Sequence, residues 1–183
     1  MRFSKHLIIG AAMLVGAGNG AMAADSPPPR DGSHDFDFDL GIWKTDITRH
    51  PHPLTHPEET IQMAGTVSVR KLWDGRAQVE EIEVDGPNGH WQGMTVFLYD
   101  PTARQWSMNF SNSSVGKFNA PMIGEFANGR GELYLQDSFE GRSILVRATW
   151  SDLTPTTHSY EESFSTDGGR TWHVSFTAQK TRA

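Results

Sequence analysis

The sequence predicts an all-β protein, an up-and-down antiparallel β-barrel of about ten strands. Short runs of alternating apolar and polar residues recur along the chain, and the joints between them are rich in Gly, Asp, Asn and Pro. No stretch shows a helical period longer than one turn. A meander of this many strands removes its exposed edges by closing on itself, and a barrel wider than eight strands leaves an interior cavity.

Residues 1–23 have the features of a secretory signal peptide. Arg2 and Lys5 give a positive start, residues 7–15 form an apolar run, and Ala21 and Ala23 supply the small residues that a signal peptidase reads. The apolar run is short and Gly-rich for a membrane span, so an uncleaved anchor is the less favoured alternative, and no other stretch could cross a bilayer. We expect a periplasmic or secreted protein.

Composition narrows the remaining possibilities. The formal net charge is -6 and no basic cluster is present, which argues against a nucleic-acid partner. The chain has no cysteine, which excludes thiol catalysis and thiolate metal sites. Residues 24–33, ADSPPPRDGS, read as a Pro-rich linker, and residues 34–183 as a single barrel domain.

The predicted strands follow one another with short connections. A 3₁₀ turn is expected within HDFDFDLGIW, before the first strand. DGR at 74–76, NGRG at 128–131 and EGR at 140–142 are typical hairpin turns. The expected strands are 42–50, 60–73, 76–85, 90–99, 104–113, 120–127, 131–139, 142–151, 157–165 and 170–181.

Alternation predicts which faces are buried. Strand 90–99 is the exception, since it carries large apolar residues on both faces. In three other strands one face is apolar: Ile144, Val146, Ala148 and Trp150 in 142–151; Trp172, Val174, Phe176 and Ala178 in 170–181; and Trp106, Met108 and Phe110 in 104–113.

The stretch STDGGRTW, at 165–172, resembles the Asp-box of sialidases. Asp167 can accept hydrogen bonds from the amides of the turn, Gly168 and Gly169 permit positive φ, and Trp172 is expected to pack inward beneath the loop. Sialidases need several four-stranded blades, which a chain of this length cannot build. We therefore interpret the motif as a structural hairpin without sugar chemistry.

Gly41-Ile42-Trp43 opens the first predicted strand and resembles the Gly-x-Trp signature of lipocalins and fatty-acid-binding proteins. That resemblance implies that Trp43 plugs the closed end of the barrel. It also implies a basic residue from the last strand, Lys180 or Arg182, lying across the indole ring in a cation–π contact.

Four segments in order, HDFDFDLGIWK, LYDPTARQWS, DSFEGRSILVRATWSD and FSTDGGRTW, resemble a secreted bacterial family of unknown function in the lipocalin-like (calycin) superfamily. This superfamily includes the fatty-acid-binding-protein and nitrobindin-type barrels. The resemblance implies a barrel with a pocket and implies no particular reaction.

Three histidines, His50, His52 and His56, lie close to Glu58 and Glu59. Such a set could hold a divalent ion, but the spacing matches no known metal site and three prolines stiffen the stretch. We expect a solvated loop at the rim of the barrel without a metal. It is also the position where a lid over the pocket is expected.

Haem is a further alternative, because nitrobindin-type barrels bind it through a barrel histidine. His158 and His173 lie on the last two predicted strands, but neither matches the motif of that family. We interpret both as ordinary sheet histidines and expect no cofactor.

Polar residues inside a barrel would bear on function, because buried polar groups require partners. Arg147 and Glu161 lie on neighbouring strands, and the apolar alternation around Arg147 favours an outward-facing pair. The candidate ligand-binding residues are Tyr134, Asp137, Arg147, His158 and Glu161, and the candidate structural residues are Gly41, Trp43, Asp167 and Trp172.

The sequence favours a protein that binds a small apolar or amphipathic molecule in its cavity. The alternative is an isomerase-, lyase- or cyclase-type enzyme that uses polar residues in the same cavity. Titratable groups converging inside the barrel would favour the enzyme, whereas a lining of apolar side chains alone would favour the carrier.

Overall fold

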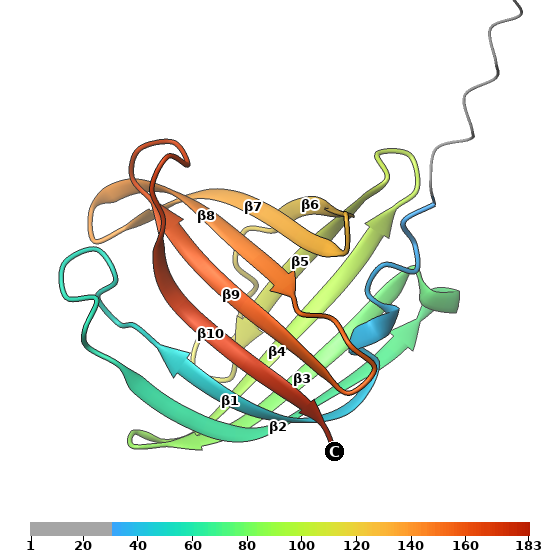
Figure 1. Ribbon diagram of the computed structural model, residues 1–183, viewed down its shortest axis with the longest axis horizontal. Coiled ribbons are helices and arrows are strands. Elements are labelled where there is room, and N and C mark those ends of the chain that lie inside the picture. The colour runs from blue at the N-terminus through green and yellow to red at the C-terminus, as the bar shows by residue number, and fades with distance from the viewer. Residues whose placement is uncertain (1–30) are drawn as a thin grey trace, which may run out of the picture.

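The computed structural model describes residues 31–183, which form a closed antiparallel barrel of ten strands. Each strand pairs with the next in sequence, and β1 pairs with β10 to close the barrel (Figure 1). The predicted fold class is confirmed. The predicted signal peptide and residues 24–30 of the predicted linker lie outside the described residues. Over residues 31–183, no helix is long and apolar enough to cross a membrane.

The observed strands agree closely with the expected ranges. Two 3₁₀ helices accompany them, η1 (Asp37–Asp39), at the expected turn, and η2 (Trp73–Gly75). The strands are β1 (Gly41–Arg49), β2 (Ile61–Leu72), β3 (Ala77–Gly86), β4 (Gly89–Asp100), β5 (Gln105–Asn112), β6 (Met122–Ala127), β7 (Arg130–Phe139), β8 (Arg142–Ser151), β9 (Thr157–Ser165) and β10 (His173–Arg182).

The segment before β1 plugs one end of the barrel. Phe36 is fully buried, and its ring centroid lies 4.6–5.1 Å from those of Phe97, Trp106, Phe126 and Trp150. Edge-to-face and tilted contacts of this kind are favoured by the ring quadrupoles. The aromatic residues at this end of β4, β5, β6 and β8 therefore close over a side chain supplied by the N-terminal segment.

Hydrogen bonds hold the start of this segment. The Trp106 Nε1–H donates to the Gly32 carbonyl oxygen at 2.9 Å, and the Gly32 N–H donates to the Tyr99 hydroxyl at 3.1 Å. The last residues of the predicted linker are thus attached to the barrel.

Trp43 occupies the closed end, as the Gly-x-Trp resemblance implied. Its side chain is fully buried, and its Nε1–H donates to the Asp39 carbonyl oxygen at 2.7 Å. Of the two expected basic residues, Arg182 lies across the ring, with Cζ 4.0 Å from the centroid. Gly41 has φ 114°, and a Cβ there would lie 2.7 Å from Arg182 Nη1, so the glycine of the motif makes room for the arginine.

The apolar face of β8 is buried as expected, but the predictions for β4, with both faces buried, and for β10, with one continuous apolar face, are wrong. On β4, Met94 is 39% exposed, so only the face of Phe97 and Tyr99 is deeply buried. On β10, the register with β9 shifts between Val174 and Phe176. This bulge places Val174 opposite Ser163 and Phe176 opposite Glu162, so the two apolar residues face opposite sides of the wall.

The Asp-box stretch is a self-contained hairpin between β9 and β10. Asp167 Oδ1 accepts hydrogen bonds from the backbone N–H groups of Arg170 and Thr171 at 3.0 and 2.9 Å, and Oδ2 accepts one from the Thr171 hydroxyl at 2.7 Å. The Thr171 bonds are the main reason that the pKa of Asp167 lies far below its ordinary value. Gly168 and Gly169 have φ values of 73° and 91°, as the turn requires.

Trp172 does not pack inward as expected. Its ring lies on the outer face of the wall, where the Arg147 guanidinium stacks over it at 4.2 Å and the Tyr134 ring lies 6.3 Å away. The ring also lies beneath the loop, since a Cβ on Gly169 would be 3.3 Å from it. The tryptophan therefore supports the hairpin from outside the barrel.

Replacing Trp43 with alanine should destabilise the protein strongly, because it empties a fully buried site at the closed end. We expect a loss of about 3–5 kcal/mol in the free energy of unfolding, measured by urea denaturation. Trp73→Ala is the matched control, since Trp73 is 67% exposed. Equal losses for the two variants would contradict the assigned role of Trp43.

Asp167→Asn should lower the melting temperature at neutral pH, because the neutral amide accepts the turn hydrogen bonds more weakly. The folded-state pKa lies below the ordinary value of 3.8, so this contribution is present above that pH and is lost as the pH falls. The difference in melting temperature should therefore narrow in acid, as thermal scans across pH would show. A difference that widens in acid would contradict this account.

Candidate functional site

The barrel encloses a cavity of about 390 Å³. Its lining is mainly apolar and includes side chains from β1 to β10 and from the loop between β5 and β6. The aromatic lining residues are Trp91, Phe97, Phe110, Phe139, Trp150, Tyr160, Phe164 and Phe176. A volume of this size lies within the range of small-molecule sites, about 300–1,000 Å³.

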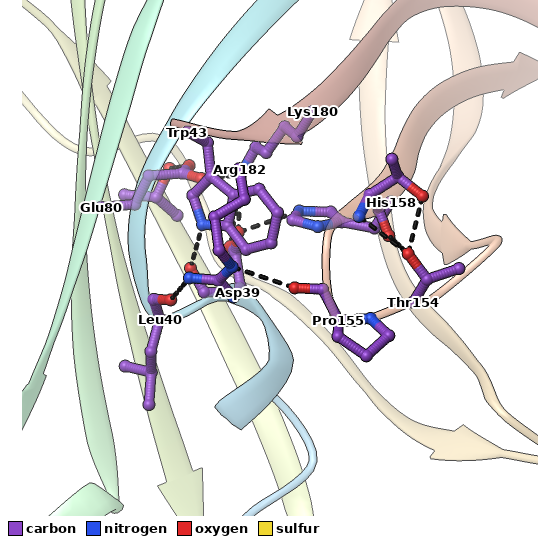
Figure 2. A network of polar contacts seen from close by, with 11 residues as sticks. Asp39, Leu40, Trp43, Glu80, Thr154, Pro155, His158, Lys180 and Arg182 are labelled. Carbon is purple, nitrogen blue, oxygen red and sulfur yellow. Dashed lines mark hydrogen bonds and ion pairs between the residues drawn. The ribbon is translucent and has the colours of Figure 1, made fainter.

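A buried charge cluster forms the floor of this cavity, at the plugged end. The ammonium group of Lys180 contacts both carboxylate oxygens of Asp39, at 3.0 and 3.2 Å, and also Glu80 Oε2 (Figure 2). Glu80 Oε1 accepts a hydrogen bond from the Thr95 hydroxyl at 2.9 Å. Lys180 and Glu80 line the cavity, whereas Asp39 lies behind them in the plug.

Mutual pairing keeps Asp39 and Lys180 ionised despite their burial. Burial alone would raise the pKa of Asp39, but Lys180 and His158 outweigh it, and the pKa lies below its ordinary value. Burial would lower the pKa of Lys180, but Asp39 and Glu80 outweigh it, and the pKa is raised. Lys180 is therefore a charged ammonium whose hydrogens point at carboxylates, which does not suit it to act as a nucleophile.

His158 belongs to the same cluster but does not line the cavity. Its Nε2 lies 2.9 Å from Asp39 Oδ1, and its ring contacts Phe38 and Trp43 edge-on, with centroids 5.0 and 4.5 Å away. His173 is exposed at the start of β10 and is also absent from the lining. Neither histidine faces the cavity, so neither is placed to ligate a haem held there.

Two polar residues of β9 project into the middle of the cavity. The ring of Tyr160 lies 5.1 Å from that of Trp150 and 6.0 Å from that of Phe176, and its hydroxyl makes no hydrogen bond within residues 31–183. Burial, reinforced by Glu162 and Glu80, raises the pKa of Tyr160 well above its ordinary value. The hydroxyl is therefore neutral and can donate and accept.

Glu162 lies two residues further along β9 and faces the same side of the strand. Its Oε1 accepts a hydrogen bond from the Ser175 hydroxyl at 2.8 Å. Burial raises the pKa of Glu162, and Asp137 adds to the shift, while Ser175 and Arg49 oppose it. Within the described chain, no cation lies within salt-bridge distance of this carboxyl group.

The structure divides the predicted ligand-binding residues between the two faces of the wall. Asp137 lines the cavity. Tyr134, Arg147 and Glu161 are absent from the cavity lining and lie on the outer face. Arg147 Nη2 lies 3.9 Å from Glu161 Oε1, which is the outward-facing pair that the alternation favoured.

Sequence reasoning missed Asp39, Glu80, Tyr160 and Glu162 as interior residues. For β9 a signal was present, because Tyr160 and Phe164 share one parity along the strand, and Glu162 and His158 share it with them. Glu161 has the opposite parity. For Asp39, which lies in a 3₁₀ turn, no strand periodicity applied.

The His-rich segment between β1 and β2 lies at the opposite end of the barrel from the plug. His52 Nδ1 contacts Glu140 Oε1 in the β7–β8 turn at 2.7 Å, Pro53 is buried, and Leu54 packs against the main core cluster. Over residues 31–183, no group of three or more His, Asp or Glu side chains is arranged to hold a metal ion. The segment thus folds over the rim and is tied to the far wall.

Lys180→Met should destabilise the protein by about 3–5 kcal/mol, because it leaves Asp39 and Glu80 buried without a cation. Lys44→Met, on the exposed face of β1, should change stability by about 0.5 kcal/mol or less. Urea denaturation at neutral pH measures both, and the Lys180→Met deficit should shrink in acid as the carboxylates become neutral. Similar stabilities for the two variants would contradict the role of Lys180.

Comparison with known proteins supports the fold and no closer relationship. No protein-family profile matches the chain, and no curated protein matches it in sequence. Among solved structures, the S-type phycobiliprotein lyase CPES from Guillardia theta is 12% identical, with a TM-score of 0.55 over 84% of this chain and 93% of that chain. The redesigned β-barrel mFAP0 bound to DFHBI is 12% identical, with a TM-score of 0.45 over 79% of this chain and 99% of that chain. At these identities the likeness is one of barrel fold alone.

Proposed function

We propose that this protein is an exported barrel that binds a small, mostly apolar molecule in its interior cavity. The observation that carries this proposal is the cavity of about 390 Å³ with its aromatic and aliphatic lining. Burying apolar ligand surface there gains about 25 cal/mol per Å². Apolar side chains outnumber polar ones in this lining, which suits a ligand with a large apolar body.

Export is part of the proposal and rests on the signal-like sequence of residues 1–23. Membership of the lipocalin-like superfamily is likewise proposed, from the Gly41-x-Trp43 start and the arginine of the last strand that lies over the indole ring.

One observation keeps an enzymatic alternative open. The cavity is not lined by apolar side chains alone, since Tyr160 and Glu162 project into it and the pKa of each is raised. Groups of this kind can act as general acids in an isomerase or lyase. Chemical change of a bound molecule by the wild-type protein, lost in Glu162→Gln, would favour this alternative over simple binding.

Narrowing the cavity should weaken binding of an apolar fluorophore such as Nile red. Val146 is buried and lines the cavity. Val146→Phe should reduce the affinity by about tenfold or more, because the larger side chain occupies space that the ligand would fill. Ile123→Phe, on the exposed outer face of β6, is the control and should bind as the wild type does. Fluorescence titration measures the affinities, and thermal scans confirm that both variants fold.

Failure of the wild-type protein to bind any apolar probe would contradict the proposed function, as would equal binding by both variants. Native mass spectrometry of the protein isolated from the exporting cell gives an independent check. We expect it to retain a small molecule, which mild organic extraction should remove.

A further inference from the structure

We propose that the cavity selects ligands that carry a basic nitrogen on their apolar body, and that Glu162 and Tyr160 bind this nitrogen. The inference rests on the proposed function, and it identifies the chemical class of the ligand. It follows from which polar groups in the cavity already have partners and which do not.

The charges at the cavity floor are already satisfied. Lys180 directs its hydrogens to Asp39 and Glu80, and Glu80 receives a second hydrogen bond from Thr95. An ammonium group has only three hydrogens to donate, so Lys180 has none left for a ligand carboxylate. An anionic ligand head is therefore not favoured at the floor.

The middle of the cavity is different, because polar groups there lack partners. Glu162 receives only the Ser175 hydrogen bond at Oε1, and the Tyr160 hydroxyl receives and donates none within the described chain. Tyr160 and Glu162 are successive inward-facing residues of β9, and the charge of Glu162 helps to raise the pKa of the Tyr160 hydroxyl. Thr45 Oγ1, buried among the lining residues, also has no partner in residues 31–183.

A protonated amine fits this arrangement. It can donate to the free carboxylate oxygen of Glu162 and to the Tyr160 hydroxyl, while the aromatic rings of Trp150 and Phe176 lie against the adjoining carbons. A largely buried carboxylate with no cation at salt-bridge distance gains more from such a partner than an exposed one does.

The groups near Glu162 are Ser175, Arg49, Asp137 and Tyr160, and they influence how amine binding depends on pH. Ser175 and Arg49 favour its ionised form, whereas burial and Asp137 disfavour it. Tyr160, the other titratable neighbour, stays neutral over the useful range. Because the pKa of Glu162 is raised, amine affinity should increase as the pH rises through that pKa and decrease again where the ligand amine loses its proton.

The rival site for a charged head group is Arg49. It lines the cavity at the end of β1 but is exposed to solvent, so its attraction for a carboxylate is screened. A fatty-acid-like ligand would use Arg49, and an amine would use Glu162. The experiment can therefore separate the two by substituting each residue.

The test compares decylamine, decanol and decanoic acid, which share one apolar chain, as competitors of Nile red or by calorimetry. We expect the amine to bind about 10- to 100-fold more tightly than the alcohol, the size of a charge-assisted hydrogen bond in a partly buried site. Glu162→Gln should remove this preference together with its pH dependence. Glu161→Gln, next in the chain but on the outer face, should retain both.

Tyr160→Phe provides a second variant that preserves the ring packing, and it should reduce the amine preference by several-fold. Equal affinities for the three ligands, with Nile red still bound, would overturn this inference and leave the proposed function intact. Tightest binding of decanoic acid, lost in Arg49→Gln, would overturn it in favour of an acid ligand. Binding of none of the probes would remove the proposed function and this inference together.

Discussion

The buried ion pair between Asp39 and Lys180 joins the two ends of the described chain. Asp39 lies in the 3₁₀ turn before β1 and Lys180 near the end of β10, 141 residues later, yet their charged atoms are 3.0 Å apart. Each charge would be costly to bury alone, so the N-terminal plug and the last strand can be buried only together. Barrel closure between β1 and β10 brings Lys180 into the interior beside Thr45.

Arg182, two residues further along β10, completes the closed end from outside. It stacks on Trp43 and donates hydrogen bonds to the Leu40 and Pro155 carbonyl oxygens at 3.0 and 2.9 Å. The two basic residues of β10 thus have separate roles, one neutralising buried carboxylates and the other covering the plug. Because Lys180 and Arg182 are fully engaged at the plugged end, the polar groups left for a ligand lie further from the plug, on β9.

The sequence predicts the barrel well because its signals are local. Turn residues separate the strands, and strict alternation, as in β8, marks the buried face. The prediction of which side chains face the interior failed where a shift of one residue exchanges the inner and outer faces of a strand. The bulge at Ser175 turns Val174 outward. On β9, the candidate named from the sequence was Glu161, which lies on the outer face, whereas its neighbour Glu162 faces the cavity. The floor cluster was out of reach, because pairing between Asp39, Glu80 and Lys180 depends on closure of the whole barrel and not on any local pattern.

A crystal structure with a brominated alkylamine would test the central claim, that the interior cavity is the binding site, most directly. A second depression of about 400 Å³, lined by Glu83, Met94 and Phe118 among others, lies on the outer face of the wall and provides an internal comparison. We predict the anomalous bromine signal inside the barrel, among Met108, Ile144 and Phe164, with the nitrogen near Glu162. Bromine found only in the outer depression, with the cavity unchanged, would contradict the account.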